Sequence, residues 1–417
     1  MTDSDIFREE TGTDSRGRPP HERPYRWIML LLTWLSYFIF GLINFALAPL
    51  VTPIIAELGI SYSQMGFVLG AWPLTYILSA AFAGAVVDRL GTRKSVAIGV
   101  LVIGLSAGLR YFTNGFVPLF LCVALFGIGG PLISVGNPKT ISQWFRGKER
   151  GMAVGIYMTG VWIGSGLSVS LMNSVIMPLT DYSWRLAFAG YGMVAVIVAC
   201  LWWLLGRDIT AAEDTKSDRI DKVFKSLISV RNVWIILLMG LLTFAAGHGF
   251  GNWLPRILEG GGLSPSMAGI AASLPTWVGI PTIIIVPRLV PPHFRGRFIA
   301  IAAAICTVLL LLVSQVTDAS LIIVLIIYGM ATCCIFPFLV LILMELPEVE
   351  SRYVGSAGGM FFCVAEIGTF AGPFLMGAVT DLSGGFTAGI IMLAGFSFLR
   401  IITSFFLKIK RPDEKKI

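Results

Sequence analysis

Charge is scarce in this chain. Of its 417 residues, 13% are Asp, Glu, Lys or Arg, whereas soluble globular proteins carry roughly 25%. The three histidines (His21, His248 and His293) lie far apart and match no metal-binding spacing. A phosphate-binding loop of the GxxxxGK[ST] type is also missing. These absences argue against a soluble domain, a histidine metal site and hydrolysis of ATP by this chain.

Cysteine is present but sparse, with six residues in all. Each of them lies inside an apolar run, where a small core side chain is a better interpretation than a disulfide framework or a metal site. We therefore expect no metal and no other cofactor.

Long apolar runs dominate the composition. Hydrophobic residues make up 56% of the chain, and the mean hydropathy is +0.81. Runs of about 20 residues, enough to cross ~30 Å of hydrocarbon, recur along almost the whole length. They lie at 27–50, 64–87, 94–112, 117–140, 152–176, 184–206, 233–258, 266–288, 297–315, 320–345, 353–379 and 386–407. The sequence predicts an all-α polytopic membrane protein with about twelve transmembrane helices in two six-helix repeats.

Basic residues divide the predicted loops by side. Of the 31 Lys and Arg residues, 28 fall in the tails and in the loops on the side of the two termini, with Arg400 counted in the C-terminal tail. The loops on the opposite side hold only Arg110, Arg185 and Arg256. The positive-inside rule then predicts a plasma (inner) membrane protein with both termini cytoplasmic. The predicted parts are an N-terminal tail (1–26), a six-helix bundle (27–206), a cytoplasmic linker (207–232), a second bundle (233–407) and a C-terminal tail (408–417).

The linker has an apolar stripe of its own. Its residues at helical spacing are Ile220, Val223, Phe224, Leu227 and Ile228. The pattern predicts a short amphipathic helix on the inner membrane surface; an ordinary solvated linker is the alternative.

The two halves carry an internal repeat. "GISYSQMGFVLGAWP" follows the first run and resembles "GLSPSMAGIAASLPT" after the seventh, with Ser61 and Ser264 at equivalent positions. Both serines suit helix N-caps, and Pro265 suits a first helical position. A weaker echo pairs 150–166 with 352–368 and puts Gly164 opposite Glu366. Parallel repeats of this kind are typical of transporters with a central site.

The stretch "GAVVDRLGTRKSVAIG" (84–99) lies between the second and third runs. Gly84 suits a close approach of helices and Gly91 a tight turn, and a merely basic loop would need neither the glycines nor Asp88. The stretch resembles the signature of the major facilitator superfamily, and the resemblance covers essentially the whole chain. It implies a gate that holds the cytoplasmic side shut. The gate residues it assigns are Gly84, Asp88, Arg89, Gly91, Arg93 and Lys94.

A narrower resemblance rests on shorter motifs. "GLRYF", "GNWLPRILEGGGLSPSMAG" and "FPFLVLILMEL" are similar to the cyanate/nitroimidazole porter branch of that family. The fifth run reads "GVWIGSG" and lacks the Gly-Pro pair of drug/proton antiporters. This weakens an efflux interpretation without excluding it.

Polar side chains inside the apolar runs must face protein or a water-filled cavity, so they mark the pathway. His248 and Asn252 share a helix face, and imidazole titrates near neutral pH. Asn137 could instead bond a neighbouring helix, and Arg110 or Arg256 could reach headgroups. The candidate substrate-binding residues are Asn44, Arg110, Asn137, His248, Asn252 and Trp253.

One carboxylate stands alone in the run "GMFFCVAEIGTFAGPFLMGAV" (359–379), namely Glu366. An ionised carboxylate at mid-span costs about 2.5–3.5 kcal/mol on insertion scales. No cation lies one helical turn away in its own helix. A protonated Glu bonded to a neighbouring helix is one interpretation; the other is a carboxylate that carries a coupling proton.

The pattern as a whole predicts a secondary active transporter that moves a small organic solute by alternating access with proton coupling. The cationic candidates favour an anion, and an exporter of a hydrophobic or cationic compound is the alternative. A membrane sensor or a membrane-embedded enzyme is the alternative of another class, but the sequence shows neither a sizeable soluble module nor a catalytic cluster. The expected partners are a small-molecule substrate, a proton and the lipid bilayer, with no nucleic acid, for a monomeric protein.

Overall fold

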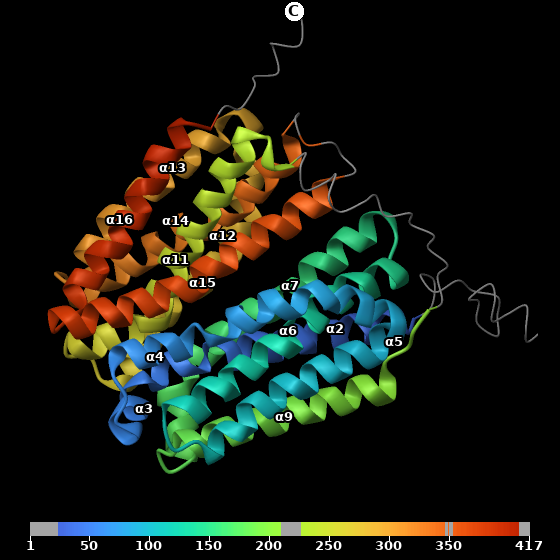
Figure 1. Ribbon diagram of the computed structural model, residues 1–417, viewed down its shortest axis with the longest axis horizontal. Coiled ribbons are helices and arrows are strands. Elements are labelled where there is room, and N and C mark those ends of the chain that lie inside the picture. The colour runs from blue at the N-terminus through green and yellow to red at the C-terminus, as the bar shows by residue number, and fades with distance from the viewer. Residues whose placement is uncertain (1–23, 210–226, 347–348, 350–352, 408–417) are drawn as a thin grey trace, which may run out of the picture. The chain divides into compact units, whose positions relative to one another are not determined.

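The computed structural model describes residues 24–209, 227–346, 349 and 353–407 (Figure 1). Most of the predicted tails and of the linker stripe lies outside the described residues. The helices, in chain order, are α2 (Arg26–Asn44), η2 (Phe45–Leu50), α3 (Val51–Leu58), α4 (Tyr62–Leu69), α5 (Ala71–Leu109), η3 (Arg110–Phe112), α6 (Phe116–Trp144), α7 (Gly147–Leu171), η4 (Met172–Ile176), α8 (Met177–Leu179), α9 (Trp184–Leu205), α11 (Arg231–Gly260), α12 (Pro265–Leu289), η5 (Pro292–Phe294), α13 (Arg295–Leu312), α14 (Asp318–Glu345), α15 (Val354–Ser383) and α16 (Phe386–Phe405).

The predicted fold class is confirmed. In the described part of the chain, 11 helices are long and apolar enough to cross a membrane. One of these, Tyr62–Phe112, has 51 residues, or about 75 Å at 1.5 Å per residue, more than twice the hydrocarbon thickness. It is broken at Gly91, whose φ of 81° and ψ of 165° are not helical. The predicted runs 64–87 and 94–112 correspond to the two parts of this element.

The chain divides into two compact units. The first comprises Met1–Ala46, Thr75–Ser168 and Thr180–Lys216, and the second comprises Leu47–Leu74, Val169–Leu179 and Ser217–Ile417. The second unit therefore combines α3, α4, η4 and α8 from the first half of the sequence with α11 to α16 from the second half. The division into bundles at 27–206 and 233–407 stays a prediction.

In the first unit, α2 packs against α6 and α9. Gly160 and Gly164 of α7 lie against the backbone of α2 at Trp34 and Phe38. A Cβ on either glycine would collide with a carbonyl oxygen of α2. This is the close approach that small residues four positions apart permit between membrane helices.

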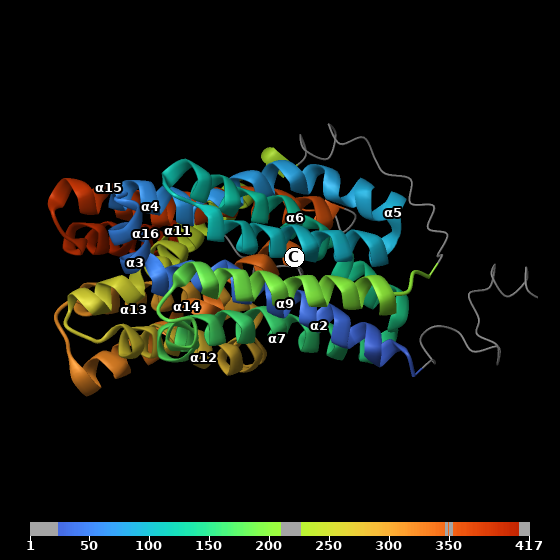
Figure 2. The ribbon, with the colours of Figure 1, turned by 90° about the horizontal axis from the view of Figure 1, so that it is seen from below.

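In the second unit, α15 packs along both α11 and α4, as both views show (Figure 1 and Figure 2). Gly368 lies against the backbone at Leu241, and Gly372 lies against Ala245. The residue numbers of α11 and α15 increase in the same direction along this contact, so the two helices run parallel.

The glycine pairs correct the register of the weaker sequence echo. Gly160 and Gly368 make equivalent contacts, as do Gly164 and Gly372, and each pair is 208 positions apart. The echo at 150–166 and 352–368 implies 202 positions, so it was wrong to set Gly164 opposite Glu366. Backbone packing places Met158 there instead.

The predicted helix starts of the stronger echo are confirmed. The Ser61 hydroxyl accepts a hydrogen bond from the Gln64 N–H at 3.2 Å, and the Gln64 side chain accepts one from the Ser61 N–H at 3.0 Å. The Ser264 hydroxyl likewise accepts one from the Met267 N–H at 3.4 Å, and Pro265 is the first residue of α12. Both serines satisfy N–H groups that a helix start leaves without partners.

Candidate functional site

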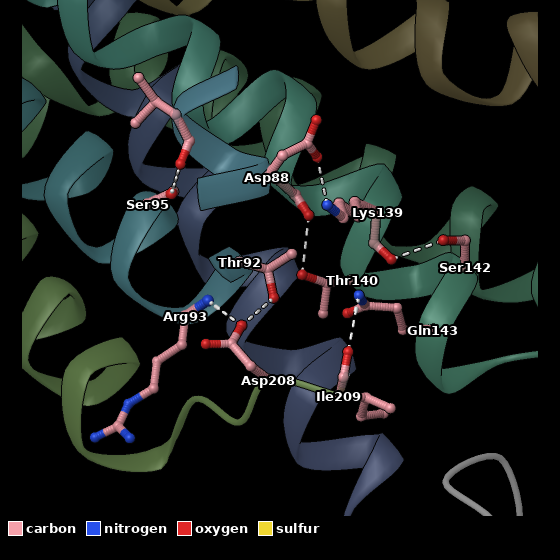
Figure 3. A network of polar contacts seen from close by, with 12 residues as sticks. Asp88, Thr92, Arg93, Ser95, Lys139, Thr140, Ser142, Gln143, Asp208 and Ile209 are labelled. Carbon is pink, nitrogen blue, oxygen red and sulfur yellow. Dashed lines mark hydrogen bonds and ion pairs between the residues drawn. The ribbon is translucent and has the colours of Figure 1, made fainter. Parts of the chain in front are cut away.

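The break in α5 is held by a carboxylate from another helix end (Figure 3). Asp208, three residues after α9, accepts hydrogen bonds at 2.9 Å from both the Thr92 hydroxyl and the Arg93 N–H. The helix that restarts at Thr92 has N–H groups without intrahelical partners and a partial positive charge, and a carboxylate satisfies both. Asp208 is therefore the cap of the third span, although its sequence position gave no sign of this role.

Gly91 makes room for that cap. Its φ is 81°, a conformation that side chains with a Cβ rarely adopt, and a Cβ there would collide with the Asp208 carboxylate. The expected tight turn is thus present. A Cβ built at Gly84 meets nothing within 4 Å among the described residues, and the close approach expected at Gly84 stays a prediction.

Arg93 and Asp88 tie the turn to two neighbouring helices of the first unit, and Figure 3 shows the Asp88–Lys139 pair. Arg93 donates from Nε to the Trp203 carbonyl at 2.9 Å, and its Nη2 reaches the same oxygen near the end of α9. Asp88 pairs with Lys139 of α6 at 2.5 Å, with 72% of the Asp88 side chain exposed. Arg89 and Lys94 are exposed. The turn network joins α5, α6 and α9, and its role as a gate stays a prediction.

His248 lies in an aromatic part of the second unit. Its ring centroid is 5.8 Å from that of Phe244 and 6.5 Å from that of Trp72. Phe244 contacts Phe336 of α14 at 5.5 Å, and Phe336 contacts Phe362 of α15 at 5.7 Å. These contacts form an aromatic cluster from α5, α11, α14 and α15, in which His248 supplies an imidazole and Trp72 an indole N–H.

Glu366 lies one helical turn beyond Phe362 on α15. It is 8% exposed, and its Oε2 has no hydrogen-bond partner among the described residues. Because α11 and α15 run parallel in the register given above, Glu366 and His248 lie about one to two helical turns apart along the pair. The Thr369 hydroxyl is the donor beside this carboxyl, and a buried carboxyl with no cation near it in its own helix is costly to ionise unless water, a cation or a ligand reaches it.

Three predicted substrate residues make structural contacts. Asn137 is 0% exposed, and its Nδ2 donates to Ser36 of α2 at 3.0 Å and to the Thr33 carbonyl at 3.3 Å. Asn252 donates to the His248 carbonyl of its own helix at 2.9 Å. Trp253 is 0% exposed and donates from Nε1 to the Pro373 carbonyl at 3.0 Å. Asn137 thus joins two helices, which is the alternative that its sequence position left open.

The two remaining candidates lie in the first unit. Asn44 is the last residue of α2 and is half-buried. Arg110 is 1% exposed, with its guanidinium 4.5 Å from the Phe188 ring centroid and its Nη2 donating to Ser106 at 3.3 Å. The headgroup alternative for Arg110 is therefore wrong, since its charged end is enclosed by α5 and α9.

Arg400 needs a similar correction. The charge pattern counts it with the C-terminal tail, but it lies inside α16, 1% exposed, and donates to Ser397 at 2.5 Å. Its Nε and Nη1 have no hydrogen-bond partner among the described residues. Residues 401–407 carry no charge, which is the sequence signal that could have separated Arg400 from the tail.

These features define a membrane transporter of the polytopic helical class: repeat-related helices, a charged turn between spans, and isolated polar groups within spans. The sequence model of the Major Facilitator Superfamily matches residues 33–365, and the chain belongs to that family. The protein is a transporter rather than an enzyme.

Relatives and solved structures agree with this assignment. The chain is 22% identical over 391 residues to a hexuronate transporter of Bacillus subtilis (strain 168), covering 87% of this chain and 91% of the relative. It is 24% identical over 362 residues to a "probable L-galactonate transporter" of Escherichia coli (strain K12), covering 81% and 79%. The crystal structure of a bacterial homologue of the human lysosomal transporter Spinster matches with a TM-score of 0.75 at 18% identity, covering 93% of this chain and 99% of the other. That last likeness shows the shared fold.

Proposed function

We propose that this transporter moves a small organic anion across the plasma membrane by alternating access, coupled to proton movement, with both termini in the cytoplasm. The observation that carries the proposal is Glu366, a buried carboxyl in the middle of α15 whose Oε2 has no hydrogen-bond partner among the described residues. A carboxyl in such a place is neutral when protonated and is costly to ionise unless water or a cation reaches it. Opening to water on one side would then allow the proton to leave.

The anion part of the proposal rests on two supports. The relatives named above transport a hexuronate and, as their names state, L-galactonate, which are both sugar acids. In this chain, His248 is a polar group of the aromatic cluster, and its imidazole can donate a hydrogen bond to a carboxylate. The guanidinium of Arg110 lies over the Phe188 ring with its Nε and Nη1 unpaired among the described residues, and we assign it a packing role. A smaller anion of the cyanate type is the narrower version that the branch resemblance favours.

The aromatic cluster supports a second candidate. The rings of Trp72 and Phe244 contact His248, and Phe336 and Phe362 extend the cluster from Phe244. Aromatic faces attract cations and apolar solutes. An exporter of a hydrophobic or cationic compound would use these rings and would place the cation near Glu366.

Reconstituted protein separates the two candidates. Proteoliposomes with an inward proton gradient should accumulate a radiolabelled hexuronate or L-galactonate, and collapse of the gradient with an ionophore should abolish accumulation. A quaternary ammonium dye and cyanate serve as the competing solutes under the same conditions. Gradient-driven movement of the dye alone would replace the anion proposal with the exporter. Accumulation of the sugar acid that ignores the proton gradient would refute proton coupling.

A further inference from the structure

The start of α4 is bound by a carboxylate of α15. Asp381 accepts hydrogen bonds from the Tyr62 N–H at 3.1 Å, from the Ser63 N–H at 2.7 Å and from the Ser63 hydroxyl at 2.5 Å. The first N–H groups of a helix have no intrahelical acceptors, and the helix start carries a partial positive charge. Asp381 therefore binds α4 at the point where a carboxylate binds best.

Side chains around Tyr62 reinforce this contact. The Tyr62 hydroxyl accepts a hydrogen bond from Arg256 at 3.2 Å. Its ring centroid is 5.8 Å from that of Trp253 and 5.4 Å from that of Phe386. Trp253 and Arg256 thus contact a segment from the first half of the sequence, which explains the burial of Trp253 and the position of Arg256 better than a headgroup or substrate role.

A second contact at a helix start lies at Asn173, in the π-helical turn η4. Its Nδ2 donates to the Pro49 carbonyl at 2.9 Å and to the Pro265 carbonyl at 3.3 Å. Its own carbonyl accepts a hydrogen bond from the Ser266 hydroxyl at 3.0 Å. Asn173 therefore also binds a helix start, that of α12, but it does so with an amide donor and its own backbone carbonyl, whereas Asp381 accepts the N–H groups of α4.

The two contacts are related by the internal repeat. Asn173 and Asp381 are 208 positions apart, as are the glycine pairs that set the register of α7 and α15. Their partners Ser63 and Ser266 are 203 positions apart, which is the offset of the capped helix starts. Each contact also joins a segment of the first sequence half to one of the second, within the second unit.

We propose that Asp381 and Asn173 form a paired latch that closes one face of the transporter, at the opposite end of the α4–α5 span from Gly91. This rests on the proposed alternating access: opening that face must pull α4 from α15 and α12 from η4, and both contacts then break. Loss of a helix cap changes an equilibrium roughly two- to thirtyfold, and typically about fivefold. Removal of the Asp381 carboxylate shifts the population toward the state that is open at this face.

Cysteine labelling tests the latch without any substrate. Ala71 is wholly buried, one residue after Gly70, which contacts Phe370 of α15. In a full-length chain whose six native cysteines are replaced, Ala71→Cys reports opening through its rate of reaction with an impermeant maleimide. Asp381→Ala should raise this rate about fivefold or more, and Asp381→Asn, which keeps one acceptor oxygen, should restore most of the closure.

Matched variants keep the test decisive. Ser383→Ala removes a hydroxyl that, in the described part of the chain, bonds Val379 and Gly385 locally, and it should leave labelling unchanged. Ser63→Ala and Asn173→Ala should each raise the rate, and they replace Asp381→Ala if it fails to fold by size-exclusion chromatography. Wild-type labelling in folded Ser63→Ala and Asn173→Ala overturns the latch. Failure to transport any sugar acid, with labelling raised as expected, refutes the proposed substrate and leaves the latch in place.

Discussion

Asp208 accepts a hydrogen bond at 2.9 Å from the backbone N–H of Arg93, a residue 115 positions earlier in the chain. The contact makes the segment after α9 the cap of a helix that restarts in the middle of α5. The Arg93 side chain in turn donates a hydrogen bond from Nε to the Trp203 carbonyl near the end of α9. The two helix ends therefore hold each other, the start through a carboxylate and the end through a guanidinium, as their partial charges favour.

Removal of the Asp208 carboxylate should destabilise this junction. Asp208→Ala leaves the Thr92 hydroxyl and the Arg93 N–H without their acceptor, at a cost of about 0.5–2 kcal/mol for a lost cap. We expect a lower melting temperature and slower transport in proteoliposomes. Asp208→Asn, which keeps an acceptor oxygen, is the control and should lie close to wild type. Equal losses in both variants would show that charge, not capping, is what matters at this position.

Gly91 and Gly84 provide a matched pair from one motif. Gly91→Ala places a Cβ at φ 81° against Asp208, and a conformation of this kind costs about 1–3 kcal/mol for other residues. Gly84→Ala meets open space among the described residues and adds a better helix former. Thermal unfolding of the purified proteins should show a clear loss for Gly91→Ala and none for Gly84→Ala. If Gly84→Ala is stable but inactive, the close approach expected at Gly84 occurs in another state of the transporter.

Most of the fold could be predicted from the apolar runs and from the residues at turns and helix starts. The spans could be placed because about 20 apolar residues have few alternatives in a membrane, and Ser61 and Ser264 could be identified because N-caps are local. Asp208 and Asp381 could not be assigned. Each stands at the end of an apolar run, where an acidic residue is ordinary, and the helix start that it binds lies far away in sequence. Only the packing of the helices selects that partner.

The polar residues within spans show the same limit. A side chain such as Asn137 or Arg110 has to find a partner inside the protein, yet its position in the sequence does not say on which side of the helix the partner lies. The structure turns Asn137 toward α2 and Arg110 toward α9. The weaker repeat echo failed for a related reason, since residue similarity in an apolar run is common by composition, whereas the backbone contacts of Gly160 and Gly368 fix the register.

Asp88 and Lys139 should matter for transport more than for stability. An exposed ion pair contributes about 0–1 kcal/mol, so Asp88→Lys should change the melting temperature little while transport falls severalfold through like-charge repulsion with Lys139. The exchange Asp88→Lys with Lys139→Asp restores the pair in reverse and should recover much of the transport rate. If the double variant is as slow as the single one, Asp88 acts through a partner other than Lys139.

Arg110 should behave as a packing residue. Arg110→Lys keeps the charge but loses the planar stacking on Phe188. We expect a lower melting temperature with the apparent substrate constant within about twofold of wild type. Uptake measured over a range of sugar acid concentrations supplies that constant. A tenfold rise without loss of stability would return Arg110 to the substrate site.

Glu366 is the residue on which proton coupling depends in our proposal. Glu366→Gln preserves size and hydrogen-bonding capacity but cannot take up or release a proton. The variant should lose accumulation driven by a proton gradient, since the translocating element no longer carries the coupling ion. Counterflow exchange needs no net proton movement, and it should persist at a rate within a few-fold of wild type.

Thr369→Val is the matched control for Glu366→Gln. It removes the neighbouring donor hydroxyl, while Glu366 can still bind a proton. Gradient-driven accumulation should therefore survive in Thr369→Val and be absent in Glu366→Gln, with counterflow present in both. A Glu366→Gln variant that still concentrates substrate, with the pH dependence of wild type, would mean that another group carries the proton. If Glu366→Gln loses both counterflow and accumulation, Glu366 contacts the substrate. A residue that only carries the proton is not needed for exchange.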